Sequence, residues 1–452
     1  MELHIAFTKS NPKYMQIYEQ IKTNIFNKTL HAHEQLPSKR ELAMQLNVSV
    51  HTVKESYEQL LAEGYIYSEQ RRGYFVSPFE FEWLSQTEPT TTIMEKTTSE
   101  FRFNFRNGQV DANAFPYQQW RKLGRKHIVA TNAPNGNWQG EYVLREQIAK
   151  YVERARGFHC DPTQIYIYSG TQNQLQALCH FFGDVQVGLE EPGFNRARFI
   201  FGQCRLPVTP IVVDESGVTI PQTKINILYT TPAHQFPLGM VMSFERRTAL
   251  LNWASEQKAF IIEDDYDSEF RYKGSPIPSL AQMDQLQCVI YFGSFSKTLL
   301  PSLRISYMIL PKSLVKAFNE YNDQQKSTVS KIDQQIIADF IAQDLYAKHI
   351  AKMRTLYRTK RIALINSIQD HLGDEFTVIG EYSGLHIVLQ LPSWLCESEA
   401  ITRARNVEVA VDPISTSYQT EATQNMVILG YGALPIHEIT EGIRRLASVW
   451  KD

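Results

Sequence analysis

The sequence has few cysteines, almost no net charge and no long apolar run. Its five cysteines are scattered, with no CxxC pair, which argues against a disulfide framework or a metal site and favours a reducing cytoplasm. No apolar run reaches the roughly 18 residues that a membrane span needs, and the N-terminus MELHIAFTKSNPKYMQ lacks the apolar core of a signal peptide. The formal net charge of −2 provides no global basic field, so any contact with DNA must come from a local motif.

The chain is too long for one ordinary domain. With 452 residues, of which 43% are hydrophobic and 21% charged, it has the composition of a globular protein with a large core. Two or three domains are therefore expected.

A lysine lies between two apolar segments in YFGSFSKTLLPSLRISYMILP, residues 291–311. Burial of a lysine is costly unless its charge is used or removed. Lys297 can lose its charge by forming a Schiff base with an aldehyde, and pyridoxal phosphate (PLP) is the cofactor that uses this reaction. The alternative interpretation is a solvated loop lysine.

The side chains near this lysine in the sequence are those that PLP requires. Asp264 follows an apolar run and would keep the pyridine nitrogen protonated, while Tyr266 would contact the 3′ oxygen. The predicted phosphate ligands are Ser294, Ser296 and Arg304. Together these spacings favour a PLP site over a surface lysine.

Residues from about 14 to 77 predict a winged helix-turn-helix. Apolar residues at helical spacing indicate a first helix, residues 39–46 a second, and Ser49 the N-cap of a third. Two short strands around residues 71–73 predict a hairpin with a basic tip. The third helix would enter the major groove of DNA and the hairpin would touch its backbone or minor groove. A small helical interaction module is the alternative.

The composition changes twice along the rest of the chain. Residues 79–101 are rich in threonine without periodicity, which predicts an exposed linker. We therefore predict a DNA-binding domain over residues 1–78 and an α/β domain over residues 102–452. Within the latter, a large subdomain is expected to about residue 310 and a small one over residues 311–452.

Two turns of the α/β part offer further contacts for a cofactor. Gly170 and Thr171 lie between a strand and a helix, where free backbone N–H groups can bind phosphate, although a plain turn is the alternative. Phe194 follows a Pro-Gly turn and could stack on a pyridine ring, and Arg196 could bind a carboxylate. An ordinary core phenylalanine and a surface arginine are the alternative interpretation of this pair.

These motifs resemble two known families. LPSKREL, NVSVHTVKESYEQL and RRGYFV resemble the DNA-binding domain of GntR-type regulators, over about the first 78 residues. SGTQ, EEPGF, TPAHQFPLG, EDDYDSEFRY and SFSKTLLPSLRISY resemble, in order, the aminotransferase-like domain of the MocR/GabR regulators. That domain has the type I PLP fold of aspartate aminotransferase, so the resemblance implies a winged helix-turn-helix joined by a linker to an α/β aminotransferase-like domain.

The resemblance also implies roles for individual residues. It assigns PLP attachment to Lys297, ring contacts to Asp264, Tyr266 and Phe194, and the effector carboxylate to Arg196. It implies that the following residues face double-stranded DNA: Lys39, Arg40, Ser49, His51, Thr52, Lys54, Arg71 and Arg72. Val50 stands where the family often has a basic residue, so His51 or Lys54 could supply that contact instead.

The sequence departs from working aminotransferases at two places. Phe236 precedes Pro237 where those enzymes usually have asparagine, and NMVILGYGAL lacks their late carboxylate-binding arginine. Efficient transamination is therefore not expected. We interpret the chain as a cytoplasmic PLP-dependent transcriptional regulator that responds to a small amino compound, as a homodimer with swapped head-to-tail domains and no membrane partner. A true aminotransferase with an appended DNA-binding domain and a sensor of PLP itself are the alternatives.

Overall fold

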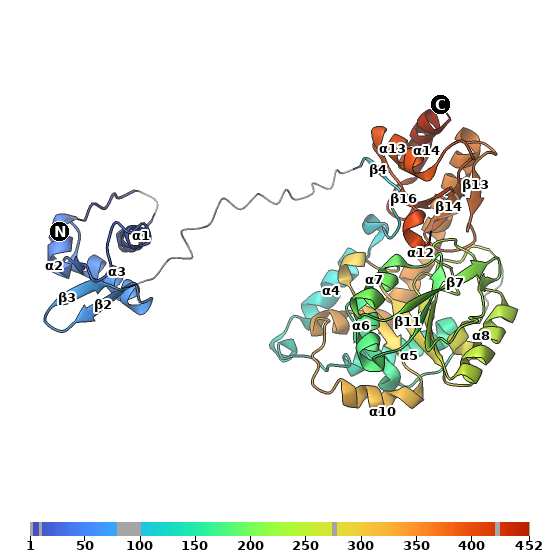
Figure 1. Ribbon diagram of the computed structural model, residues 1–452, viewed down its shortest axis with the longest axis horizontal. Helices are drawn as coiled ribbons and strands as arrows, with labels where there is room; N and C mark the ends of the chain where they lie inside the picture. Colours follow the sequence, from blue (N-terminus) through green and yellow to red (C-terminus); the bar gives the residue numbers. More distant parts are fainter. Residues whose placement is uncertain (1–2, 9–10, 79–100, 274–277, 421–424, 452) are drawn as a thin grey trace. The chain divides into compact units, whose positions relative to one another are not determined.

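The structure is a computed structural model that describes residues 3–8, 11–78, 101–273, 278–420 and 425–451. The chain forms two compact units, Met1–Ser99 and Glu100–Asp452 (Figure 1). The linker predicted for residues 79–101 lies outside the described residues, except for Phe101.

The N-terminal unit is built from three helices and a small sheet around one apolar core. Its elements are α1 (Lys13–Phe26), β1 (Gln35–Leu36), α2 (Lys39–Gln45), α3 (Val50–Ala62), β2 (Ile66–Glu69) and β3 (Gly73–Val76). Ile17, Ile21 and Val53 are fully buried where α1 and α3 pack together. Serine caps start the second and third helices: Ser38 Oγ accepts a hydrogen bond from the Glu41 N–H (3.3 Å), and Ser49 Oγ accepts one from the Thr52 N–H (3.0 Å).

The small sheet has the strand order β1–β3–β2, in which β2 and β3 form an antiparallel hairpin. Gly73 follows the hairpin turn with φ +111°, a conformation that side chains other than glycine rarely adopt. The third strand, β1, was not predicted because two residues are too few to show a period of two. The predicted winged helix-turn-helix is confirmed.

The C-terminal unit is organised around an eight-stranded sheet. In spatial order its strands are β5 (Ile165–Tyr168), β12 (Ser306–Ile309), β11 (Val289–Ser294), β10 (Phe260–Asp265), β9 (Ile227–Thr230), β6 (Val187–Glu191), β7 (Val208–Asp214) and β8 (Gly217–Val218). The strands from β11 to β7 run parallel, while β12 is antiparallel to both of its neighbours. Ligands of parallel α/β sheets bind at the carboxyl ends of the strands, and this edge is where the predicted PLP residues fall.

Helices cover both faces of this sheet (Figure 1). Ile165 and Ile167 face one apolar core, and Tyr166, between them, faces the other, because successive side chains of a strand alternate. The covering helices are α4 (Tyr117–His127), α5 (Tyr142–Arg156), α6 (Thr171–Phe182), α7 (Asn195–Gln203), α8 (Phe244–Gln257), α9 (Leu280–Met283), α10 (Lys312–Tyr321) and α11 (Lys331–Ala342). The predicted α/β class of this unit is confirmed.

A second core forms around a smaller sheet. Its elements are α12 (Leu345–His371), β13 (Thr377–Ile379), β14 (His386–Gln390), α13 (Glu397–Asn406), β16 (Asp412–Pro413), β17 (Met426–Gly430) and α14 (Ile436–Trp450). A separate parallel pair joins β4 (Phe103–Asn104) to β15 (Val409–Ala410), so residues 409–413 are divided between two sheets.

Packing crosses the predicted subdomain boundary near residue 311. Phe103 and Phe105 belong to the core of the small sheet, while Ile336 and Ile337 of α11 pack against the large one. Both observations concern contacts between distant parts of the chain, which local periodicity does not report. Among the described residues, even the 27-residue α12 is too polar to lie in a bilayer, and no helix has both the length and the apolar character to cross one.

Candidate functional site

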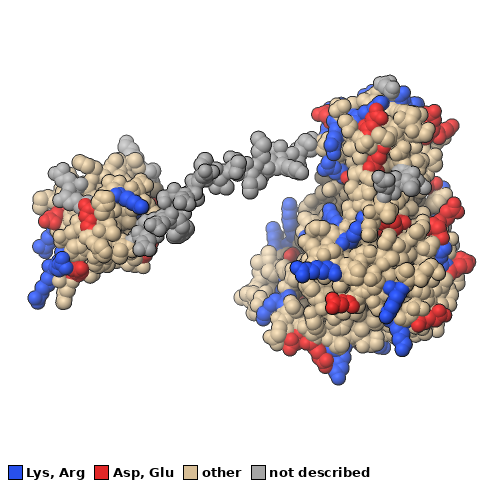
Figure 2. All heavy atoms as spheres, viewed as in Figure 1, with Lys and Arg blue, Asp and Glu red and all other residues tan. Residues whose placement is uncertain are grey.

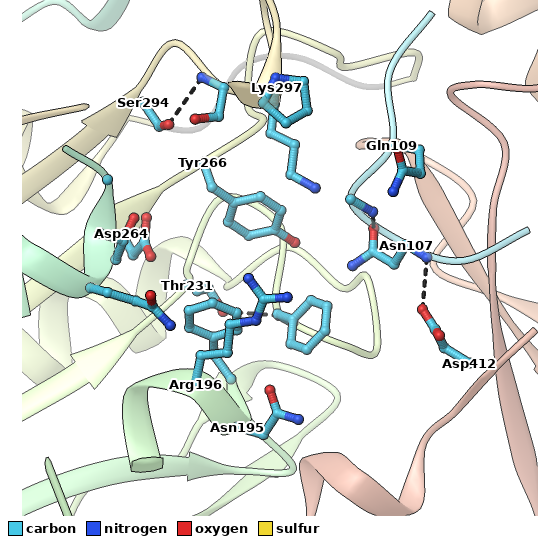
Figure 3. Close-up of a pocket in the computed structure, with 18 of the residues that line it drawn as sticks. Asn107, Gln109, Asn195, Arg196, Thr231, Asp264, Tyr266, Ser294, Lys297 and Asp412 are labelled. Atoms are coloured by element: carbon cyan, nitrogen blue, oxygen red, sulfur yellow. Dashed lines mark hydrogen bonds between the residues drawn. The ribbon is translucent and has the colours of Figure 1, made fainter. Parts of the chain in front are cut away.

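A cavity of about 560 Å³ opens at the carboxyl edge of the large sheet (Figure 3). The structure brings together there every residue predicted to contact PLP or an effector: Lys297, Asp264, Tyr266, Gly170, Thr171, Phe194, Ser294, Ser296, Arg304 and Arg196. They lie at or near the ends of five strands of the sheet, β5, β6, β10, β11 and β12, so the strand ends position them.

Lys297 lies just beyond the end of β11, and its side chain points into the cavity (Figure 3). Burial lowers the pKa of its amine, Asp267 and Asp264 oppose that effect, and Arg196 adds to it. A Cβ atom placed on Gly108 would lie 3.6 Å from Lys297 Nζ, an ordinary contact distance, so this turn borders the amine, and it is the φ of +96° that favours glycine there. A lowered pKa favours the neutral amine, which is the nucleophilic form that condenses with an aldehyde.

Asp264 is a buried acid near the end of β10. Burial raises its pKa to about 7, against the hydrogen bond that Tyr229 Oη donates to the carboxylate. Among the described residues, no lysine, arginine or histidine forms an ion pair with Asp264. A protonated pyridine nitrogen would supply the missing positive charge, so this acid fits the N1 position of PLP.

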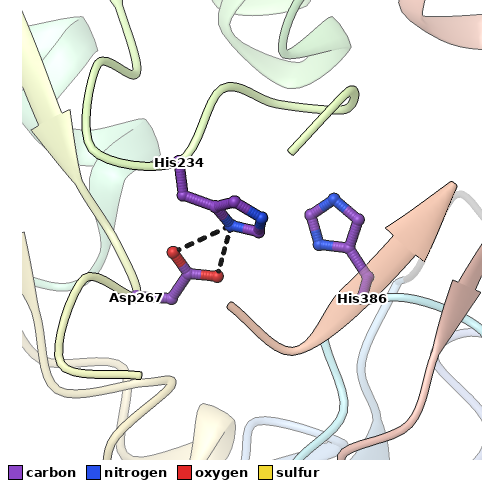
Figure 4. Close-up of side chains that lie close together, drawn as sticks. All are labelled: His234, Asp267 and His386. Carbon is purple, nitrogen blue, oxygen red and sulfur yellow. Dashed lines mark hydrogen bonds and ion pairs between the residues drawn. The ribbon is translucent and has the colours of Figure 1, made fainter. Parts of the chain in front are cut away.

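Tyr266 contacts His234, which forms a buried group with Asp267 and His386 (Figure 4). Its hydroxyl donates to the carbonyl oxygen of His234 (2.9 Å) and lies 3.1 Å from His234 Nδ1. Asp267 Oδ2 is 3.0 Å from the same Nδ1. His386, whose pKa burial lowers to about 3, packs against His234 and donates from Nε2 to Pro237 O at 2.9 Å. The hydroxyl that would contact the 3′ oxygen is thus fixed by buried partners.

Donors converge where β5, β11 and β12 end side by side. Ser294 and Ser306 pair in the sheet register, and the Gly170 N–H donates to Ser306 Oγ at 3.1 Å. Arg304 Nη2 donates to Ser169 O at 3.3 Å and lies 2.5 Å from where a Gly170 Cβ would be. The guanidinium therefore packs directly on the N-terminus of α6, and only glycine permits this approach. Guanidinium, hydroxyl and helix N-terminal N–H groups at one place are suited to a phosphate.

The opposite wall carries Phe194 and Arg196 at the start of α7. The Phe194 ring is nearly parallel to that of Tyr229, with 17° between their planes, and borders the cavity. Arg196 extends from α7 toward Tyr266 and Lys297 (Figure 3). Its positive charge in this position suits the carboxylate of a small ligand.

The residues predicted to face DNA lie in the N-terminal unit. Six of them are exposed, namely Arg40, Ser49, His51, Lys54, Arg71 and Arg72, while Lys39 and Thr52 are half-buried. On α3 two side chains lie close to acids of the same helix: His51 Nε2 is 3.6 Å from Glu55 Oε1, and Lys54 Nζ is 3.5 Å from Glu58 Oε1.

The hairpin tip is also basic. Lysine and arginine side chains gather at the edge of the N-terminal unit that carries the β2–β3 turn (Figure 2). Arg72 pairs with Glu69 and lies over the Phe75 ring, whereas Arg71 has φ +67° at the turn. Exposed ion pairs of this kind contribute less than about 1 kcal/mol, so they leave the cations available to phosphate.

Sequence reasoning missed several residues of the cavity. Tyr229 and the His234–Asp267 pair lie behind the cavity lining. Tyr229 contacts Asp264, and His234 contacts Tyr266, both of which were predicted. Asn107 donates its N–H to Asp412 Oδ2 (2.7 Å) across the cavity wall, between positions 305 residues apart in the chain. In the sequence, the Asn-Gly pair at 107–108 indicates a turn in this part of the cavity wall, but it does not show which residues the turn contacts.

Comparisons with known proteins match both units. The family model "Bacterial regulatory proteins, gntR family" matches residues 13–76, and "Aminotransferase class I and II" matches residues 103–422. The chain is 42% identical to the HTH-type transcriptional regulator YdeL of Bacillus subtilis, with 97% of each chain covered. It is 30% identical to the probable rhizopine catabolism regulatory protein MocR of Rhizobium meliloti, with 97% of this chain and 94% of that protein covered.

A solved structure resembles the C-terminal unit. The kynurenine aminotransferase of Pyrococcus horikoshii, in complex with PMP, superposes with a TM-score of 0.70 at 26% identity, covering 78% of this chain and 91% of that one. The predicted fold class, a GntR-type winged helix-turn-helix followed by an aminotransferase fold, is confirmed.

The buried Asp264 generates the first prediction. Its pKa is near 7 in the folded protein and about 3.9 in an unfolded chain, so its neutral form is favoured by folding. The contribution of this group to stability is therefore complete below about pH 4 and lost as the pH rises through 7. Without PLP, Asp264→Asn should be more stable than the wild type at pH 8, by on the order of 2–4 kcal/mol, and no more stable at pH 4.

Urea unfolding of the PLP-free proteins between pH 4 and pH 8 checks this prediction. Adding PLP should reverse the order at pH 8, because asparagine cannot provide the negative charge that a pyridinium nitrogen needs. A stability difference that does not change with pH would contradict the role given to burial of this acid.

Proposed function

We propose that a small amino compound entering the Lys297 cavity changes the affinity of this protein for operator DNA. The premise is that the chain belongs to the MocR-type family of HTH-type transcriptional regulators. The observation that carries the proposal is the combination in one chain of a winged helix-turn-helix with a cavity whose half-buried lysine, buried acid and phosphate-type donors converge. The chain would act in the cytoplasm, where operator DNA is found.

The residues of the cavity fit PLP, which the aminotransferase fold implies. When bound, PLP would supply an aldehyde that condenses with a primary amine with loss of water, so that an incoming amine can take the place of the lysine amine, which is released. In our proposal Lys297 holds the cofactor covalently, Asp264 keeps a proton on the ring nitrogen, and Tyr266 contacts the 3′ oxygen. Gly170, Thr171, Ser294, Ser296 and Arg304 hold the phosphate, and Phe194 excludes water from one ring face.

Charge in the cavity limits what the effector can be. Among the described residues that line it, the cations are Lys297, Arg304 and Arg196. The first two are assigned to the cofactor, so Arg196 is left for one carboxylate. Ile428 of β17 lines the wall from the late strand on which aminotransferases carry a second arginine. We therefore propose a ligand with one amine and one carboxylate, and little steady-state transamination.

Exchange of the amine generates the second prediction. With PLP bound, a responsive amino acid should change the visible absorbance of the protein and shift its DNA affinity by roughly 5- to 150-fold, the usual range of allosteric coupling. Lys297→Ala should lose the absorbance of the lysine-linked cofactor and the DNA response together. Lys316→Ala, on a lysine with an 88% exposed side chain, is the matched control and should keep both.

Fluorescence anisotropy with the DNA upstream of the gene, across a panel of amino acids, measures the response. A true aminotransferase would instead turn over amino acid and keto acid continuously. A PLP sensor would respond to PLP alone and to no amine. An amine response that persists in Lys297→Ala would overturn the proposal.

The exposed Arg40 generates the third prediction. It lies in the first turn of α2, where phosphate contacts of this motif are made. Each phosphate contact contributes about 0.9 to the slope of log affinity against log salt, so Arg40→Gln should lower affinity for all sequences and make the slope shallower by about that amount. Lys28→Gln removes the same charge from an exposed position beyond α1 and should leave the slope unchanged. Identical slopes for the two variants would argue against a phosphate contact by Arg40.

A homodimer is the fourth prediction. Exposed apolar side chains stand directly after α4, where Ile128 is 70% and Val129 is 47% exposed, as expected of a protein interface. A two-fold dimer with swapped head-to-tail domains would also present two α3 helices to two half-sites of an operator. Micromolar protein should sediment as one species of twice the chain mass.

Two variants test the surface used. Ile128→Glu should weaken the dimer at least tenfold, because a charge would be buried at the interface. Ile362→Glu, on an isoleucine of α12 that is 46% exposed, should have no such effect. A monomeric wild type that binds its operator with full affinity would rule the dimer out.

A further inference from the structure

A second cavity of about 560 Å³ lies in the C-terminal unit and shares no lining residue with the Lys297 cavity. Its wall is formed by the C-terminal end of α5, part of α8, the segment after β10, the first half of α12 and the turn before β14. Six cationic residues line it: Arg156, Arg247, Arg271, Lys273, Arg354 and Arg358. Glu269 is the acidic residue among the lining residues that the structure describes.

Several buried polar atoms on this wall lack a hydrogen-bond partner. In the described part of the chain, the buried side-chain atoms without a hydrogen bond include Arg247 Nη1, Arg156 Nε, Ser268 Oγ and Ser383 Oγ, and all four residues line this cavity. Arg247 is 1% and Ser383 is 3% exposed, so bulk water does not satisfy them. Leaving such donors unpaired is costly, and proteins rarely do so without a ligand or a water that accepts from them.

The positive charge of the wall is only partly neutralised. Arg156 pairs with Asp265 at 2.7 Å, and Arg247 lies 3.7 Å from Glu263. By contrast, Arg271 and Arg354 donate to backbone carbonyl oxygens. Within the described ranges, no carboxylate forms an ion pair with either of them or with Arg358. About two to three positive charges are therefore left for a ligand.

We propose that this cavity binds a small metabolite through a dianionic oxyanion group, either a phosphate or a dicarboxylate. The wall offers guanidinium N–H and serine O–H donors from several directions, which suits a group made of acceptor oxygens. One guanidinium group can donate hydrogen bonds to two such oxygens at once, so arginine is the residue expected here. A cavity of this size is larger than an inorganic anion, so an organic body fits beside the charged group.

The position of the cavity connects two cores. The start of α12 packs against the large sheet through Tyr346 and Ile350, and its middle packs against the small sheet through Met353 and Tyr357. Arg354 and Arg358 lie on this middle part, while Arg156 and Arg247 belong to helices of the large sheet. A ligand held by both sets ties the two cores together.

Two residues that line this cavity are next in the chain to the residues that hold Tyr266. Ala233 and Ser268, which line it, are the chain neighbours of His234 and Asp267. An occupant therefore contacts the two segments that hold the tyrosine of the PLP cavity. This makes the second cavity a regulatory site for an anion that is separate from the amine site.

The test uses the full-length chain saturated with PLP, so that the phosphate donors around Arg304 are occupied. Inorganic phosphate and malonate are titrated by calorimetry and thermal unfolding, with sodium chloride at matched ionic strength as the reference. We expect one of the two dianions to bind and to raise the unfolding temperature. Arg354→Gln and Arg358→Gln should each weaken that binding about tenfold, because each removes a charged donor.

Two controls separate the cavity from other causes. Arg405→Gln removes an exposed arginine of α13 that lies outside both cavities, and it should bind as the wild type does. Arg304→Gln alters the first cavity and should also leave the affinity within about twofold. A phosphate response identifies a phosphate ligand, and a malonate response a dicarboxylate. Stabilisation equal to that by chloride, or loss in Arg304→Gln without loss in Arg354→Gln and Arg358→Gln, would overturn the proposal.

Discussion

The Lys297 amine and the Asp264 carboxyl are buried in one cavity, and burial disfavours the charge of both. Neither group would be placed there for stability alone, since a buried ionisable group costs free energy unless it is paired. A cofactor with an aldehyde at one end of its ring and a basic nitrogen at the other relieves both costs at once. Through this cavity, the stability of the folded protein is therefore linked to the binding of its ligand.

The large sheet makes this arrangement possible. Parallel strands end at one edge, so turns that are far apart in the chain meet there, and the antiparallel β12 brings Arg304 back to the same edge. The helices on both faces keep the strands dry and rigid, whereas the turns at their ends need no regular hydrogen bonding. Function can therefore reside in the turns while the fold is held elsewhere.

The N-terminal unit solves a different problem with local interactions. Serine caps start both helices of the helix-turn-helix, and Tyr57 of α3 donates to Pro37 O at 2.9 Å, which fixes the turn before α2. Lys54 and Arg72 are held in exposed pairs with neighbouring acids, which are weak enough to be exchanged for phosphate. This unit thus needs little burial of charge, in contrast to the C-terminal unit.

Local patterns predicted much of this molecule because the interactions behind them are local. Helix caps, apolar periodicity and the motif around Lys297 act over a few residues, so the two units, most helices and the PLP-type residues could be predicted. The two-residue β1 and the division of residues 409–413 between two sheets could not, because long-range strand pairing decides them.

The sequence by itself determined which side chains can do chemistry here: a lysine, an acid, a tyrosine and an arginine, each beside a strand end. Only the tertiary structure decided which partners they have. Tyr229 beneath Asp264 and the His234–Asp267 pair behind Tyr266 each join residues separated by 30 or more positions. The donors without hydrogen bonds in the second cavity come from residues spread between 156 and 383. The physical reason is that pKa values and hydrogen-bond partners depend on burial and on neighbours in space, and a linear pattern records neither.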